Sequence, residues 1–129
     1  RDQLAPGTWT LVEGAGGVAV PIDAQHDMMD FAKRLELPIL IVARDGLGVL
    51  SYVRTAFHYA RSREVEVLAC VLSRFGQPEL SHQTNAEVLR SLVDVPIFET
   101  CATSDDDEQL AAEVIRSGLV EYLINRLVP

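Results

Sequence analysis

The chain has 129 residues, which is enough for one domain (residues 1–129) with a sizeable buried core. Hydrophobic residues make up 48% and charged residues 23%, the balance of an ordinary soluble globular protein. The formal net charge of −8 argues against nucleic acid and anionic membrane surfaces as partners, because both would repel the chain. An anionic nucleotide can still bind locally, because backbone amides and Mg²⁺ supply positive potential.

The first predicted element is a short apolar strand, Trp9–Val12, which runs into Glu13 and the small residues Gly14-Ala15-Gly16-Gly17. In open parallel α/β sheets, ligands bind outside the carboxyl ends of the strands. A carboxylate there is a hard-oxygen ligand suited to Mg²⁺, and glycines let backbone N–H groups approach an anion. The stretch therefore predicts half of a nucleotide–metal site. The other half would be a phosphate-binding GxxxxGK[ST] loop, and these 129 residues contain no such sequence.

Apolar runs and amphipathic stretches then alternate along the chain. The apolar runs at 37–43, 65–72 and 95–98 predict three further strands. Helical spacing predicts helices over Asp27–Leu35, Gly48–Ser62, Ser81–Leu92 and Asp106–Leu127. The expected fold class is α/β, a partial doubly wound parallel sheet with helices on both faces. Because no helix precedes the first strand, we expect an upstream segment or another chain to cover that edge.

Apolar side chains at helical spacing are expected to face the sheet. In the first three helices they are Met28, Phe31, Ala32, Leu35, Leu50, Val53, Phe57, Ala60, Ala86, Leu89 and Val93. In the last helix they are Leu110, Val114, Leu119, Leu123 and Leu127.

Acidic and histidine side chains have simpler explanations than metal binding. The run Asp105–Glu108 favours the positive end of the last helix, with Ser104 as its cap. The three histidines, His26, His58 and His82, lie far apart without ligand spacing, and we expect them on the surface or beside helices.

The two cysteines lie too far apart in the sequence to indicate a metal cluster or a disulfide framework. Cys70 lies in an apolar run and Cys101 follows another, so we expect buried or half-buried free thiols in a reducing compartment. Without a charged-then-apolar leader or an apolar stretch long enough for a bilayer, the sequence predicts a cytoplasmic protein and no membrane partner. The start at Arg1 leads us to expect a processed, fused or truncated piece.

The stretch Val12–Gly17, followed by Pro21, resembles the glutamate loop of dethiobiotin synthetases, which belong to the P-loop NTPase class. The likeness continues in chain order over residues 8 to 101, about the carboxyl half of such an enzyme. Its further segments are Leu37–Val42, Leu47-Gly48, Leu68–Leu72, Asn85–Leu89 and Val95–Ile97. The resemblance implies a P-loop NTPase-like fold that lacks its P-loop half.

The resemblance also implies an activity and site residues. Dethiobiotin synthetases are homodimers that carboxylate 7,8-diaminopelargonate, phosphorylate the carbamate from ATP and close a ureido ring. Glu13 would then bind Mg²⁺, and the backbone of Gly14, Ala15, Gly16 and Gly17 would lie beside the carbamate and the transferred phosphoryl group. The helix start at Gly48, Val49, Leu50 and Ser51 would hold the substrate's carboxylate across the dimer interface. The alternative for that segment is a plain loop-to-helix turn. Ser73, after the third strand, would bind the nucleotide.

Three positions depart from the family pattern. The family commonly has asparagine where this chain has Ser51 and Ser73, and a serine hydroxyl cannot pair bidentately as an amide does. Asp45 places a negative charge where a neutral residue would suit an incoming carboxylate. The sequence therefore leaves two functions open. One is an ATP- and Mg²⁺-dependent dethiobiotin synthetase that requires an upstream P-loop half. The other is a non-catalytic regulatory or docking domain of the same type.

Overall fold

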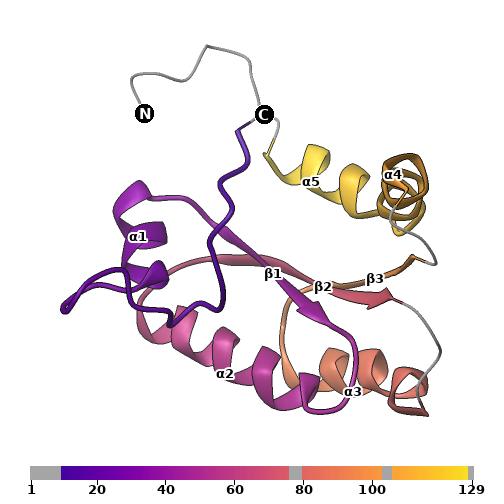
Figure 1. Cartoon of the computed structure of the whole chain (residues 1–129), viewed down its shortest axis with the longest axis horizontal. Helices are drawn as coiled ribbons and strands as arrows, with labels where there is room; N and C mark the ends of the chain where they lie inside the picture. Colours follow the sequence, from indigo (N-terminus) through magenta and orange to yellow (C-terminus); the bar gives the residue numbers. More distant parts are fainter. Residues whose placement is uncertain (1–9, 76–79, 103–105, 128–129) are drawn as a thin grey trace.

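The computed structural model describes residues 10–75, 80–102 and 106–127, and it confirms an α/β fold (Figure 1). The described strands form one parallel sheet with the order β1-β2-β3. The strands are β1 (Ile39–Arg44), β2 (Val67–Phe75) and β3 (Ile97–Ala102). The α-helices are α1 (Met28–Leu35), α2 (Val49–Ser62), α3 (Asn85–Leu92), α4 (Asp107–Arg116) and α5 (Leu119–Leu127), with a 3₁₀ turn η1 over Leu80–Gln83.

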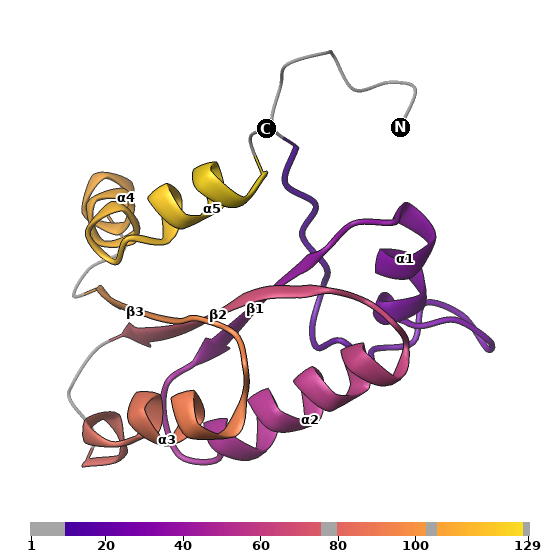
Figure 2. The same cartoon turned by 180° about the vertical axis from the view of Figure 1, so that it is seen from behind.

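Helices cover both faces of the sheet. In Figures 1 and 2, α2 and α3 lie below it and α4 and α5 lie above it. The main core lies between the sheet and the α2–α3 layer, as the apolar spacing predicted. Its buried members are Ile41, Val49, Val53, Phe57, Cys70, Leu72, Ala86, Leu89, Val93 and Ile97. Burial of this one cluster holds β1, β2 and β3 against the two helices that follow β1 and β2.

The α4–α5 layer is attached to the sheet by α4, which packs against β3, and by Tyr122 of α5. Its ring lies 5.4 Å from the Phe98 ring, centroid to centroid, and its hydroxyl donates a hydrogen bond to the Leu68 carbonyl (2.9 Å). Leu119 is buried at the start of α5. None of the helices in the described ranges is both long and apolar enough to cross a bilayer.

The predicted strand at 9–12 does not form over residues 10–12, the part of it that the structure describes. Trp9 lies outside the described residues, and Thr10–Val12 form no strand, with Leu11 89% exposed. A strand exists only when a neighbour pairs with it, and the described residues offer no partner here. Within the described residues, β1 consequently pairs only with β2, and Val42, which points away from α2, is 65% exposed.

The boundaries of two helices, and the side of α1 that is buried, also differ from the prediction. The predicted helix 106–127 breaks at Gly118, whose φ of +82° ends α4 and separates it from α5. The predicted helix 81–92 is the 3₁₀ turn followed by α3. In α1, Met29 is the buried residue whereas Phe31 is 40% exposed, because the helix turns a different side to the body of the protein.

The last helix is also capped differently and packs less deeply than expected. Ser104 and Asp105 lie outside the described residues, and Asp106 is the cap of α4, accepting a hydrogen bond from the Glu108 amide (3.2 Å). Leu110 and Leu127 are exposed rather than turned to the sheet.

Candidate functional site

The turn from β1 into α2 lies at the carboxyl edge of the parallel strands. Gly48 adopts a left-handed backbone (φ 92°) before the first residue of α2, a conformation that favours glycine. The Val49 amide donates to the Gly46 carbonyl (3.2 Å), and the Ser51 amide donates to the Gly48 carbonyl (3.0 Å). Two of the amides expected to be free for a ligand are therefore used within the turn. Gly48 and Ser51 are exposed, Leu50 is half-buried and Val49 is buried.

Ser73 lies at the same edge, near the end of β2. It pairs with Arg44 in β1 and Thr100 in β3, and its carbonyl accepts a hydrogen bond from the Asp45 amide (2.8 Å). Asp45 immediately precedes the Gly46–Gly48 turn. The structure thus brings together two of the predicted sets, the nucleotide position Ser73 and the segment 48–51.

The described contacts of the glutamate loop, residues 13–17, are with Val20 and Met28 rather than with the β1–α2 turn. Glu13, Gly14, Ala15, Gly16 and Gly17 are all exposed. A Cβ on Gly14 would lie 2.6 Å from the Met28 side chain, and Gly16 has a φ of +80° with Val20 beside it. These contacts place the loop against the start of α1 rather than against the α2 N-terminus. The roles of Glu13 and its glycines stay a prediction.

Helix α1 packs on the far end of α2. The Asp27 carboxylate caps α1 and accepts a hydrogen bond from the Tyr59 hydroxyl of α2. That hydrogen bond and those from the amides of Asp30 and Met29 lower the pKa of Asp27. Arg63 pairs with Asp30 beside it. The glutamate loop therefore lies near the carboxyl end of α2, at the opposite end of that helix from its N-terminus.

A buried polar network supports the β1–α2 turn, and sequence reasoning missed it. The Asp45 side chain is fully buried and accepts hydrogen bonds from Arg74 Nε (2.6 Å) and Asn85 Nδ2 (2.7 Å). Arg74 also pairs with Glu99, which binds Arg90 (2.9 Å). The concern that Asp45 would face an incoming carboxylate is wrong, because its charge is turned inward and paired.

The network is electrostatically balanced. Burial lowers the pKa of Arg74, but the hydrogen bonds and charges of Asp45 and Glu99 outweigh burial and raise it overall. Arg74 therefore stays charged, and its two acidic partners are neutralised by Arg74 and Arg90 together. Only the pattern of an acid after β1 and a base late in β2 could have indicated this pair in the sequence.

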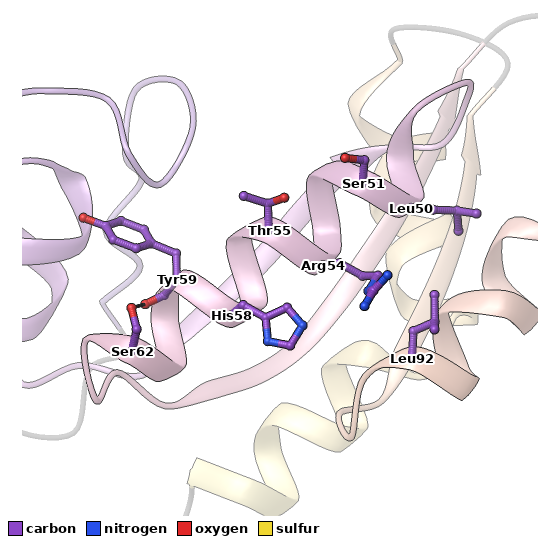
Figure 3. Close-up of a pocket in the computed structure, with 8 residues that line it drawn as sticks. All are labelled: Leu50, Ser51, Arg54, Thr55, His58, Tyr59, Ser62 and Leu92. Atoms are coloured by element: carbon purple, nitrogen blue, oxygen red, sulfur yellow. Dashed lines mark hydrogen bonds between the residues drawn. The ribbon is translucent and has the colours of Figure 1, made fainter.

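The outer side of α2 carries a shallow groove of about 700 Å³. Figure 3 shows that its lining runs along α2 from Ser51 to Ser62, with Leu92 of α3 facing Leu50. Arg54 lies in this groove one turn beyond Ser51 and supplies an exposed cation next to the predicted substrate segment. Arg54 was not among the site residues predicted from the sequence, although its spacing of three residues from Ser51 placed both on one helical face.

Two of the three histidines contact neighbouring polar groups. His26 binds Asp23 (3.0 Å), and His82 Nε2 lies 3.0 Å from the Asp45 carbonyl. His58 is exposed on α2. Across the described ranges, no three His, Cys, Asp or Glu side chains are placed to hold a metal ion.

The two thiols lie in different surroundings. Cys70 is buried, and desolvation raises its pKa to about 12, which keeps the thiol neutral. Cys101 is exposed, contrary to the expectation of a buried or half-buried thiol, although Thr100 and Ala102 beside it on β3 are buried.

Comparison with known proteins identifies the family. The family described as AAA domain matches residues 6–114. The ATP-dependent dethiobiotin synthetase of Aquifex aeolicus is 31% identical over 119 residues, which cover 92% of this chain and 53% of that protein. The enzyme of the same name from Bacillus cereus strain G9842 is 35% identical over 123 residues, 89% of this chain and 51% of that protein.

The chain thus spans about half the length of these curated relatives. The matched region includes the glycine-rich stretch at 13–17, the β1–α2 turn, and both Ser51 and Ser73. The chain therefore belongs to the AAA domain family, and the resemblance to dethiobiotin synthetases inferred from its sequence is confirmed.

Proposed function

We propose that this chain forms part of an ATP-dependent enzyme of the dethiobiotin synthetase type. The observation that carries the proposal is that the β1–α2 turn and Ser73 both lie at the carboxyl edge of the parallel sheet, where the Asp45 amide, just before the turn, donates to the Ser73 carbonyl. That edge is where open α/β sheets bind their ligands. The names of the relatives give ATP-dependent synthesis of dethiobiotin. From the resemblance to that family we propose that CO₂ adds to an amine of 7,8-diaminopelargonate, ATP phosphorylates the carbamate, and the second amine closes the ring and releases phosphate.

The amino end of α2 would hold the carboxylate of the substrate across the dimer interface, because the glutamate loop of the same chain lies at the other end of α2. A helix start favours an anion through its dipole and its unpaired amides. Because the Val49 and Ser51 amides already donate within the turn, the exposed Ser51 hydroxyl and the Arg54 guanidinium carry more of this role than the sequence suggested. Arg54 can pair with a carboxylate through two parallel N–H groups. The groove beyond it offers room for the aliphatic part of the substrate.

Glu13 would hold Mg²⁺ on the phosphates of the nucleotide. Its exposed carboxylate fits this ion, since Mg²⁺ at phosphate sites takes one or two protein carboxylates and keeps several waters. When bound, Mg²⁺ neutralises charge on the phosphate oxygens. The small side chains of 14–17 leave backbone amides accessible beside it, and Ser73 offers one hydroxyl to the base.

The phosphate-binding loop would come from outside these residues. The chain has no GxxxxGK[ST] sequence, so an upstream P-loop half is part of the proposal. We further propose that the assembled protein is a cytoplasmic homodimer.

Substitution of Glu13 tests the proposal in the full product of the gene that encodes this chain. The variant E13Q keeps the size of the side chain and removes its charge. The expected result is a loss of Mg²⁺-dependent turnover of at least about 100-fold, the scale of removing one electrostatic group from an active site. E121Q, on the exposed face of α5, is the matched control and should keep wild-type turnover. Turnover in E13Q equal to that of E121Q would contradict the metal role, and an inactive wild type would favour the regulatory or docking function.

A further inference from the structure

Every polar group of Asp45 has a described partner. Its amide donates to Ser73, and its carbonyl lies 3.0 Å from Nε2 of His82. Its two carboxylate oxygens accept from Asn85 (2.7 Å) and Arg74 (2.6 Å). These partners come from β2, η1 and α3, so three elements converge on the residue that leads into the α2 turn.

Asn85 connects this residue to the turn itself. Its side-chain amide donates to the Asp45 carboxylate and also lies 3.4 Å from the Gly46 carbonyl, which the Val49 amide reaches as well. Asn85 is 5% exposed. Since water cannot replace these bonds at a buried position, another shape of the turn would leave polar groups without partners.

The charges near the turn also matter for an anionic ligand. Asp45 and Glu99 are matched by Arg74 and Arg90. The network can therefore brace the turn with a carboxylate without cancelling the attraction of the α2 N-terminus for an anion.

We infer that Asp45, Arg74 and Asn85 act together as positioning residues, holding the Gly46–Gly48 turn so that the α2 N-terminus is preformed for the carboxylate of the substrate. This inference rests on the proposed function. None of the three residues needs to touch the substrate. They fix the turn that orients the α2 N-terminus with Ser51 and Arg54, and ligand binding then does not have to pay for ordering the turn.

Substitution of Asn85 separates positioning from general stability. N85A removes both side-chain hydrogen bonds at the first position of α3, and N85S is a milder variant that keeps a hydroxyl donor. N125A, at an exposed asparagine on α5, is the matched control. Hydrogen exchange of amides 48–52 is measured in the folded chain, and KM and kcat for 7,8-diaminopelargonate are measured in the intact protein.

In N85A we expect exchange at 48–52 to be about tenfold faster and KM for diaminopelargonate to rise about tenfold, the effect of one lost charged hydrogen bond. KM for ATP should change less than about twofold, N85S should lie between N85A and wild type, and N125A should match wild type. Unchanged exchange at 48–52 in folded N85A or N85S would overturn the inference. So would an unchanged KM for diaminopelargonate when the wild type is active. An inactive wild type would overturn the proposed function and the inference with it. The other two failures are recognised separately, because a change in KM can be measured only in an active wild type and hydrogen exchange does not depend on activity.

Discussion

Removal of Arg74 should destabilise the fold far more than removal of a surface arginine. The Asp45 side chain is fully buried and the Arg74 side chain is 24% exposed, so R74M leaves a carboxylate in the core with Asn85 as its remaining side-chain partner. Breaking a buried pair in this way costs about 3–5 kcal/mol. Partial exposure of Arg74 lowers the expectation to about 3 kcal/mol, a large share of the stability of a small domain, about 5–15 kcal/mol.

The double variant D45N/R74M removes both charges and should recover most of this loss, because no uncompensated charge remains. R126M provides the control. It breaks the pair of Arg126 with Glu66, whose side chains are 56% and 55% exposed, and should cost less than about 1 kcal/mol.

Urea unfolding at pH 7, followed by far-ultraviolet circular dichroism, measures all four proteins. In 1 M salt, the R126M effect should shrink while the R74M effect persists, because ions screen exposed charges more than buried ones. Equal free energies of unfolding for R74M and R126M would refute this reasoning. A double variant no more stable than R74M would refute it too.

Three further predictions follow from the same structure. A thiol reagent at pH 8 should modify Cys101 in the native protein and leave Cys70 unmodified until the protein unfolds. Because burial raises the pKa of Cys70 in the fold, its thiol ionises more easily in the unfolded chain, and the free energy of unfolding should fall above about pH 9. The pKa of Asp27 is lowered in the fold, first by its hydrogen bond from Tyr59, so its ionised carboxylate stabilises the fold above about pH 4 and this stabilisation is lost as the pH falls. The difference in urea midpoint between wild type and D27N should therefore be largest at neutral pH and shrink steadily on acidification below about pH 4. Calorimetric titration of the 129-residue chain with Mg·ATP should show no micromolar binding, because the chain lacks a phosphate-binding loop, and tight binding would contradict that view.

The sequence predicts the sheet well because its strands are apolar on both sides. The run at 37–43 corresponds to β1 and the run at 65–72 to the first part of β2. β2 continues through Ser73 and Arg74, which a hydrophobicity pattern does not place in a strand. Their polarity is accommodated because they lie at the carboxyl end of the sheet, where Arg74 meets Asp45.

The helix boundaries depend on single residues, such as glycines, whose effect on helix ends the apolar spacing does not show. Gly118 was visible in the sequence, and a glycine after a helical stretch is a common helix stop. The apolar spacing on both sides of it favoured one long helix instead. The strand at 9–12 failed for another reason: strand formation depends on a neighbour, and no local pattern supplies one.

The sequence predicts the β1–α2 turn of the candidate site, but it does not predict the side-chain contacts that support this turn. Gly48 and the start of α2 follow from a strand that ends in glycines before an amphipathic stretch. The Asp45–Arg74 and Asp45–Asn85 bonds join residues 29 and 40 positions apart. Such contacts depend on the register of β1 and β2 and the seating of α3, which a single sequence does not reveal.

The most direct test of the proposed function is product formation by the intact protein. The protein is incubated with 7,8-diaminopelargonate, Mg·ATP and ¹³C-bicarbonate, and the products are analysed by mass spectrometry. We predict dethiobiotin carrying one ¹³C atom in its ureido carbon, formed together with one ADP and one phosphate. If a folded protein that contains the upstream half forms no ¹³C-labelled product in the presence of ATP, the proposed function is contradicted.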